Sequence, residues 1–221
     1  MEPFEDNQGL EEFRSRLGMK QAVASTNGKM WAFIDEIMEF ELIRDEEQML
    51  TVKLMNQGLG IEVLISLVYA KCTQQERLRL WESMYDMENT STIPWMVGGD
   101  FNVISNEEEK LGGRTVTESK SRDFNHCINM CNLEDKGFKG SKYMWWNGRT
   151  DEECIFKRLD RVLCNDKLHN IFPVVEIEHL IRSGSDHTPL LISFKATNER
   201  VSKPFRFLNF WIQEESFKGV V

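Results

Sequence analysis

The chain has 221 residues, a mass of 25.9 kDa and a formal net charge of −9, from 27 basic and 36 acidic side chains. The hydrophobic fraction of 41% and the charged fraction of 29% are typical of a globular protein and exclude a collagen-like or disordered chain. No apolar run reaches the ~20 residues that a membrane-spanning helix needs. The acidic start over residues 1–6 does not resemble a secretory signal. We therefore expect a nuclear or cytoplasmic protein, not secreted and without membrane contact.

The acidic charge is unevenly distributed along the chain. A protein that binds nucleic acid through charge alone is normally basic, because it neutralises phosphates. Residues 136–167 nevertheless hold eight basic side chains against five acidic ones. Both a local basic surface and an ordinary mixed surface fit this count. The eight are Lys136, Lys139, Lys142, Arg149, Lys157, Arg158, Arg161 and Lys167.

Five cysteines without a secretory signal indicate reduced thiols. Cys127 and Cys131 lie four positions apart beside His126, a spacing that suggests a zinc site. No second ligand pair with finger-like spacing follows. We therefore favour the alternative, that these two cysteines lie on the buried face of a helix.

The first seventy residues predict a helix followed by strands. Leu10, Phe13 and Leu17 recur at helical spacing. The Asn27-Gly28 pair suits a tight turn between two strands, because it accepts positive φ angles. The apolar run at 61–70 is typical of a strand buried on both faces. In chain order we expect a helix over 8–17 and strands over 21–25, 30–34, 36–44, 49–55 and 61–70.

The remainder of the chain alternates helices with short strands. Thr73 and Glu76 have the spacing of a capping box at a helix N-terminus. This mixture of elements predicts a single α/β or α+β domain. After the capped helix we expect a strand over 94–98, a helix over 119–133, strands over 143–146 and 156–163, a helix near 165–171, and strands over 174–180 and 190–194.

Three polar motifs lie at the ends of predicted strands. Gly-Gly-Asp-Phe-Asn at 98–102 follows a buried strand, at the edge where open α/β sheets bind ligands. Arg-Leu-Asp-Arg at 158–161 places a carboxylate in an apolar run, where it needs a partner. Gly-Ser-Asp-His at 184–187 offers a metal ligand beside a group that titrates near neutral pH. Each motif taken singly fits a turn, a cap or an exposed strand. His187 is a natural partner for Asp160.

In combination these motifs resemble the endonuclease/exonuclease/phosphatase superfamily, which includes AP endonucleases, DNase I-like enzymes and inositol phosphate phosphatases. The matching segments are Val97–Asn102, Arg158–Asp160 and Ser185–His187. Leu67–Ala70 resembles the segment that carries the family's active-site tyrosine. The resemblance implies an α+β fold, the DNase I-like four-layer α/β sandwich, in which two packed β-sheets are flanked by helices.

Other segments resemble, more narrowly, the endonuclease domain of plant LINE-type (non-LTR) retrotransposons. These are Gly137–Gly140, Tyr143–Arg149 and Phe156–Arg161. The aromatic segment at 203–211 resembles the stretch that joins such a domain to a reverse transcriptase. The resemblance thus implies an endonuclease domain over residues 1–197 and a connector over 198–221, in a chain originally fused to a reverse transcriptase.

The resemblance also implies a catalytic role for five residues. Asp100 would activate or orient the attacking water, and Asn102 would donate to the phosphoryl oxygens. Asp160 would pair with His187, and Tyr69 would contact the scissile phosphate. Either Asp100 or His187 would act as the general base, and the sequence does not choose between them.

Asp186 and Glu2 would hold Mg²⁺ or Mn²⁺, since a hard cation prefers carboxylate oxygens and neutralises charge on a phosphodiester under attack. The resemblance further implies an earlier strand that ends in a metal-binding Asn, and on this resemblance we expect this sequence to lack that strand. We expect its absence to expose backbone and apolar groups of a sheet. Glu2 would then be poorly held as a ligand.

We expect Trp146, Asn147 and Arg149, together with Trp145, to contact DNA by stacking and through phosphates. Core packing of either tryptophan is the alternative. The sequence thus predicts a Mg²⁺-dependent DNA endonuclease that leaves a primer end for reverse transcription. Two alternatives stay open. One is a truncated, catalytically inactive relic that binds nucleic acid or protein, and the other is a phosphatase of the same fold that acts on a small phosphate ester.

Overall fold

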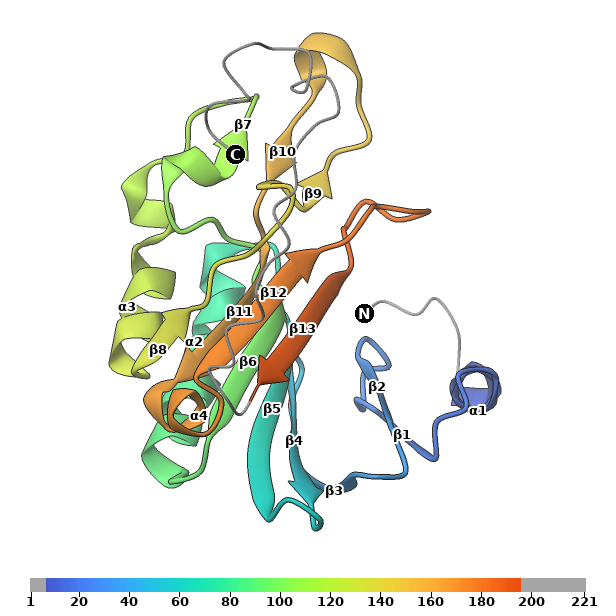
Figure 1. Cartoon of the computed structure of the whole chain (residues 1–221). Helices are drawn as coiled ribbons and strands as arrows, with labels where there is room; N and C mark the ends of the chain where they lie inside the picture. Colours follow the sequence, from blue (N-terminus) through green and yellow to red (C-terminus); the bar gives the residue numbers. More distant parts are fainter. Residues whose placement is uncertain (1–6, 196–221) are drawn as a thin grey trace, which may run out of the picture.

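The computed structural model describes residues 7–195, and this part of the chain is built around a six-stranded sheet (Figure 1). Strands β5 and β6 run parallel, and helix α2 provides the long crossover connection that two parallel neighbours need. The other neighbours in the sheet pair antiparallel. Glu2 and the predicted connector over 198–221 lie outside the described residues. In sheet order the strands are β3 (Glu39–Asp45), β4 (Met49–Asn56), β5 (Ile61–Tyr69), β6 (Trp95–Asp100), β11 (Asp160–Asn165) and β8 (Leu133–Asp135).

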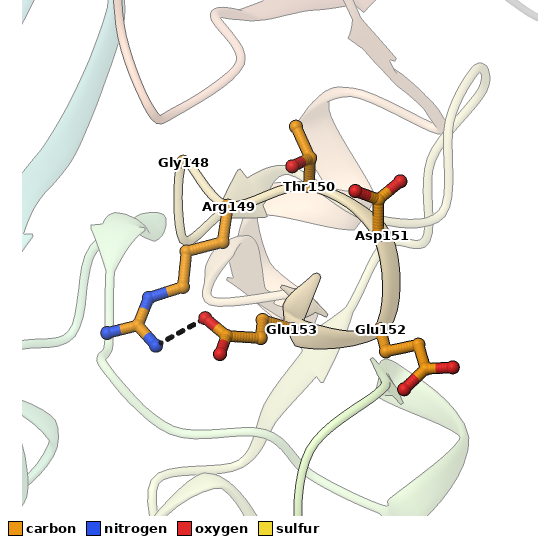
Figure 2. Close-up of a pocket in the computed structure, with 6 residues that line it drawn as sticks. All are labelled: Gly148, Arg149, Thr150, Asp151, Glu152 and Glu153. Carbon is orange, nitrogen blue, oxygen red and sulfur yellow. Dashed lines mark hydrogen bonds and ion pairs between the residues drawn. The ribbon is translucent and has the colours of Figure 1, made fainter.

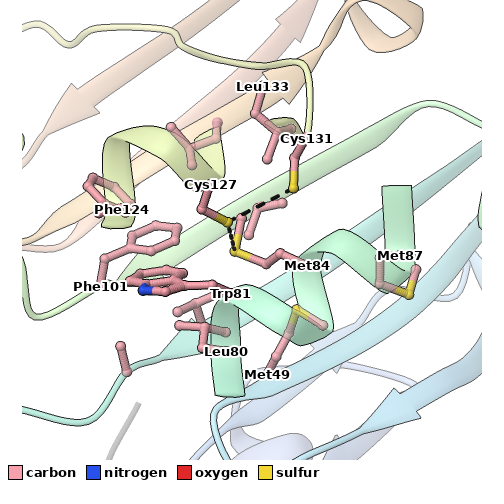
Figure 3. Packing of buried hydrophobic residues seen from close by; sticks show 14 of the residues in the cluster. Met49, Leu80, Trp81, Met84, Met87, Phe101, Phe124, Cys127, Cys131 and Leu133 are labelled. Carbon is pink, nitrogen blue, oxygen red and sulfur yellow. Dashed lines mark hydrogen bonds between the residues drawn. The ribbon is translucent and has the colours of Figure 1, made fainter. Parts of the chain in front are cut away.

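Helices α2 (Gln74–Thr90) and α3 (Arg122–Met130) cover one face of this sheet (Figure 1). Figure 3 shows Cys127 of α3 pointing toward Met84 of α2, with the two sulfur atoms 3.9 Å apart. Cys127 and Cys131 are both fully buried in this core. The prediction of buried cysteines on a helix face is therefore confirmed for Cys127, whereas Cys131 is buried directly after the last residue of α3.

Strands β12 (Val174–His179) and β13 (Leu190–Lys195) form a second sheet that packs on the opposite face, together with α4 (Asp166–Ile171). Consecutive strand residues point to opposite faces. Val63 of β5 accordingly lies in the core beneath β12, while Leu64 lies in the core beneath α2. The apolar run at 61–70 is thus a strand buried on both faces, as predicted.

Two smaller sheets complete the described fold. The hairpin β1 (Gln21–Ala24) and β2 (Trp31–Ile34) turns through Gly28, whose φ is +69°. Helix α1 (Asn7–Arg16) packs on this hairpin through Phe13, whose ring centroid lies 6.1 Å from that of Trp31. The second small sheet has the order β7 (Lys110–Leu111), β10 (Phe156–Lys157) and β9 (Trp145–Trp146).

The predicted strand over 156–163 is two strands in different sheets. β10 pairs with β7 and β9, whereas β11 pairs with β6 and β8, so the chain crosses between sheets at Arg158 and Leu159. The predicted helix over 119–133 is also shorter, because a 3₁₀ turn at Glu118–Lys120 precedes α3 and Asn132 adopts a φ of +49° behind it. Within residues 7–195, no helix is long and apolar enough to span a membrane.

Gly99, next to the end of β6, provides a test of this strand arrangement. Its φ is +139°, and a Cβ atom at this position would lie 2.1 Å from the carbonyl oxygen of Val68. We expect Gly99→Ala to lower the free energy of unfolding by about 2 kcal/mol or more, measured by urea denaturation. Gly98→Ala is the control, because its Cβ would approach no atom more closely than 3.5 Å. Equal stability of the two variants would contradict the close approach of Gly99 to the backbone of Val68.

Candidate active site

Three of the predicted catalytic residues lie side by side at one edge of the large sheet. Tyr69 ends β5, Asp100 ends β6 and Asp160 begins β11. Tyr69 pairs directly with Asp100, and Asp100 pairs directly with Asp160. Directly paired residues point to the same face of a sheet. The register therefore brings two carboxyl groups and a phenol to one place.

His187, in the loop before β13, completes this group. Its Nδ1 atom lies 2.7 Å from Oδ2 of Asp160, and its Nε2 atom lies 3.8 Å from Oδ2 of Asp100. Both carboxylates are buried, with Asp100 3% and Asp160 4% exposed. The structure thus makes the Asp160–His187 pair that the sequence predicted and directs the other ring nitrogen toward Asp100.

This arrangement shifts the pKa values of two groups in ways that suit acid–base chemistry. Burial, followed by repulsion from the Asp160 carboxylate, raises the pKa of Asp100 to about 6. Burial alone would lower the pKa of His187. The hydrogen bond to Asp160 and the surrounding carboxylates outweigh it, so the net change raises the pKa of His187. His187 therefore keeps its proton to a higher pH than a free imidazole, beside a carboxyl group that ionises near pH 6.

Asn102 holds the ends of β5 and β6 together. Its backbone has a φ of +49°, a left-handed conformation that Asn tolerates better than most residues. Its N–H donates to Oδ1 of Asp100 at 2.8 Å, and its Nδ2 donates to the carbonyl of Ala70 at 2.7 Å. One amide hydrogen is thus used within the protein, which leaves the second for a ligand oxygen.

Asp186 is exposed on the loop beside His187, and strand β9 holds it in place. Nε1 of Trp145 donates to Oδ2 of Asp186 at 3.0 Å, and the backbone N–H of Trp146 donates to the Asp186 carbonyl at 3.1 Å. An isolated antiparallel bridge also joins Trp145 to His187. Trp145 therefore connects the small three-stranded sheet to the edge of the large sheet that carries Asp100 and Asp160, a role that the sequence did not reveal.

The carboxylates in the described part of the chain fit a divalent cation only in part. Among residues 7–195, no three His, Cys, Asp or Glu side chains are arranged to hold a metal ion. Mg²⁺ commonly keeps several water molecules and takes only one or two protein carboxylates, together with substrate phosphates. Asp186 can supply one such ligand. Glu2, the second predicted ligand, lies outside the described residues.

The two tryptophans of β9 point to opposite faces of the small sheet, because side chains alternate along a strand. Trp145 lies on the face of Asp186. Trp146 stacks on Phe156, with ring centroids 6.4 Å apart, and its Nε1 donates to the carbonyl of Arg149 at 2.8 Å. Trp146 is therefore half-buried against its own sheet. Its contact with DNA stays a prediction.

Asn147 and Arg149 belong to the loop that joins β9 to β10, which also contains the 3₁₀ turn Asp151–Glu153. Nδ2 of Asn147 donates to the carbonyl of Glu153 at 2.9 Å, so this amide closes the loop. Figure 2 shows Arg149 pointing toward Glu153, and the two side chains form an ion pair at 3.0 Å. Arg149 is exposed, and its pairing with DNA also stays a prediction.

A buried ion-pair network that the sequence did not indicate supports β11. Arg158 binds Glu109 at 3.0 Å and Asp135 at 2.7 Å, and Arg161 binds the same two carboxylates. Burial opposes ionisation of Glu109, but the hydrogen bond to Arg161 and the adjacent charges outweigh it and lower the pKa of Glu109. The network anchors the residues on either side of Asp160. Glu109 ends the 3₁₀ turn Glu107–Glu109, and nothing in its local sequence marks it as a partner.

The Asp160–His187 hydrogen bond can be tested by titration. Because Asp160 raises the pKa of His187, we expect Asp160→Asn to lower that pKa, measured by NMR of the imidazole protons in metal-free protein. Asp186→Asn is the control, since Asp186 makes no hydrogen bond to the ring and has the smallest of the effects on it. A shift in the control as large as that in Asp160→Asn would contradict the assigned pairing.

Comparison with known proteins supports a fold and not a closer relationship. No family model and no curated protein matches this sequence. The endonuclease domain of TRAS1, a telomere-specific non-LTR retrotransposon, matches the structure with a TM-score of 0.64 and 13% identity, covering 79% of this chain and 80% of its own.

Two further solved structures are similar. TDP2 from D. rerio, complexed with a single-strand DNA product, matches with a TM-score of 0.58 and 14% identity over 86% of this chain and 83% of its own. An endonuclease/exonuclease/phosphatase family protein from Bacteroides thetaiotaomicron has a TM-score of 0.56 and 14% identity, over 83% and 78%. The packed sheets, the flanking helices and these similarities show that the chain has the DNase I-like fold of the endonuclease/exonuclease/phosphatase proteins.

Proposed function

We propose that this protein is a divalent-metal-dependent endonuclease that hydrolyses phosphodiester bonds in DNA and derives from a non-LTR retrotransposon. The observation that carries the proposal is the contact of His187 with Asp160, and its approach to Asp100, at the sheet edge of a DNase I-like fold. The retrotransposon endonuclease and the DNA-bound TDP2 among the similar structures support DNA as the substrate.

In the proposed reaction, the water oxygen bonds to phosphorus while Asp100 accepts a proton from it, the P–O bond to the leaving strand end breaks, and the departing oxygen takes a proton from solvent. Its Oδ1 atom is held by the N–H of Asn102, which leaves Oδ2 directed toward the ring of His187. The protonated form of His187, which the bond to Asp160 stabilises, donates from Nε2 to the phosphate as negative charge accumulates there. The remaining amide hydrogen of Asn102 and the hydroxyl of Tyr69 contact the other phosphoryl oxygens.

The metal ion belongs beside Asp186 in this proposal, with Glu2 as a second ligand. When bound, Mg²⁺ or Mn²⁺ would neutralise charge on the phosphodiester. The chain's own contribution is to orient Asp186, which Trp145 fixes through its indole N–H. Strand β9 therefore sets the position of a ligand that is otherwise exposed on a loop.

A second candidate function is a DNA-binding module without catalytic activity. One observation favours it, namely that residues 7–195 do not gather three metal ligands. A small-ester phosphatase of the same fold is the third possibility. The endonuclease, the binding module and the phosphatase differ in whether they cleave DNA, bind it without cleavage, or hydrolyse a small phosphate ester. One set of assays therefore separates them.

The nicking of supercoiled plasmid in Mg²⁺ or Mn²⁺, followed on agarose gels, tests the proposal. We expect His187→Ala to reduce the nicking rate by about 10²- to 10⁴-fold, because it removes the proposed proton donor. Asp186→Ala should reduce it strongly as well, and EDTA should abolish it. His169→Ala is the matched control, because His169 is exposed on α4 and contacts none of the site residues.

The outcomes distinguish the candidates. Nicking that both site variants leave unchanged would rule out the site assignment. Binding of DNA without nicking by the unsubstituted chain would favour the inactive module. Hydrolysis of a small ester such as bis(4-nitrophenyl) phosphate without nicking of DNA would favour the phosphatase.

A further inference from the structure

The small three-stranded sheet places two lysines and a tryptophan in one row. Lys157 of β10 pairs directly with Lys110 of β7 on one side and with Trp145 of β9 on the other. Directly paired residues of antiparallel strands share a face. We call Lys110, Lys157 and Trp145 the lysine row. Phe156 and its partners occupy the opposite face.

The central lysine of the row has an aromatic partner and no acidic one. The Nζ atom of Lys157 lies 4.8 Å from the centroid of the Trp145 ring, and the side chain is half-buried. Among the described residues, no carboxylate lies within ion-pair distance of it. Lys53, another half-buried lysine, by contrast binds Glu41 at 2.6 Å.

Lys157 also lies opposite a charge of its own sign. Like charges directly opposite each other in a sheet are destabilising, and this chain carries an excess of acidic residues that could have relieved the pair. Burial, and then the charge of Lys110, lower the pKa of Lys157, and the opposing effect of Asp100 does not give full compensation. An anion bound at this position would supply that compensation.

The row begins at the candidate active site. Trp145, on which Lys157 rests, donates to Asp186 and bridges to His187 through the backbone. In sheet order Trp145 is followed by Lys157 and then by Lys110, so the two lysines lie beyond the tryptophan that contacts Asp186. Along a DNA backbone further phosphates follow the scissile one, whereas a small phosphate ester carries a single phosphate.

We propose that the lysine row is a subsite for the DNA backbone, in which Lys157, held on the Trp145 ring, binds a phosphate next to the scissile one and Lys110 extends the contact. This inference rests on the proposed function and deepens it, because a contact with a second phosphate requires a substrate that carries more than one phosphate. Lysine serves as a point charge for phosphate, and the indole restricts the positions that its flexible side chain adopts.

The salt dependence of DNA binding tests this subsite without requiring catalysis. We would measure the affinity for a fluorescent DNA duplex by anisotropy in EDTA, between about 50 and 200 mM salt. Loss of one phosphate contact should lower the slope of log K against log [salt] by about 1. We expect that change in Lys157→Met, with weaker binding at low salt, and a largely retained slope in Lys157→Arg.

Lys139→Met is the matched control, since it removes the same charge from an exposed lysine on another surface, where Lys139 pairs with Glu176. It should bind DNA as the unsubstituted protein does. If thermal denaturation shows that Lys157→Met is not folded, Lys110→Met tests the same row, with the same expected loss of slope. A slope and affinity unchanged in folded Lys157→Met, or the failure of the unsubstituted protein to bind DNA at low salt, would overturn the proposal.

A kinetic comparison separates this inference from the proposed function. In an active protein, Lys157→Met should raise KM for DNA and leave the hydrolysis of bis(4-nitrophenyl) phosphate unchanged. If the unsubstituted chain binds DNA with a salt dependence that Lys157→Met reduces, but does not nick DNA, the endonuclease assignment fails and the subsite stands. If the chain nicks DNA and the slope does not depend on Lys157, the subsite fails and the endonuclease assignment stands.

Discussion

The candidate site depends on one electrostatic constraint, the burial of two carboxylates on neighbouring strands with a single imidazole between them. Asp100 and Asp160 pair directly in the sheet and are almost completely removed from water, so each ionised group needs compensation. His187 supplies it, with one ring nitrogen bonded to Asp160 and the other directed toward Asp100. The same contacts set the titration of the site, because the pKa of His187 is raised above that of a free imidazole and the pKa of Asp100 is raised to about 6.

Much of the surrounding structure keeps this group in position. Asn102 ties the end of β6 to the end of β5, and Arg158 and Arg161, which flank Asp160 in the sequence, bind the buried carboxylate of Glu109 and the half-buried one of Asp135. A buried ion-pair network contributes little net stability, because desolvation offsets the attraction. Its effect here is geometric, since it holds the strand that carries Asp160. Trp145 of the small sheet contacts this site on one side, through its hydrogen bond to Asp186. On the other side it pairs with Lys157 of the lysine row.

Features that depend on residues near one another in sequence were predicted well. The apolar run of β5, the turn at Gly28 and the helix behind Thr73 follow from spacing and local backbone preference, and all three are present. The pairing of Asp160 with His187 was also predicted, because a carboxylate in an apolar strand needs a partner. The single strand expected over 156–163 was wrong, since no local signal marks the point at which the chain leaves one sheet and enters another.

The motifs at 98–102, 158–161 and 184–187 were readable without a structure, and they indicated the fold and the kinds of side chain available to the site. Most of the contacts between these side chains and their supports follow from the packing of the folded chain. The hydrogen bond from Trp145 to Asp186 spans 41 positions, and that from Arg161 to Glu109 spans 52. Strand alternation likewise placed Trp145 at the site and turned Trp146 away from it. Such contacts depend on the register between strands, which is set by packing across the whole sheet and not by any short segment of the chain.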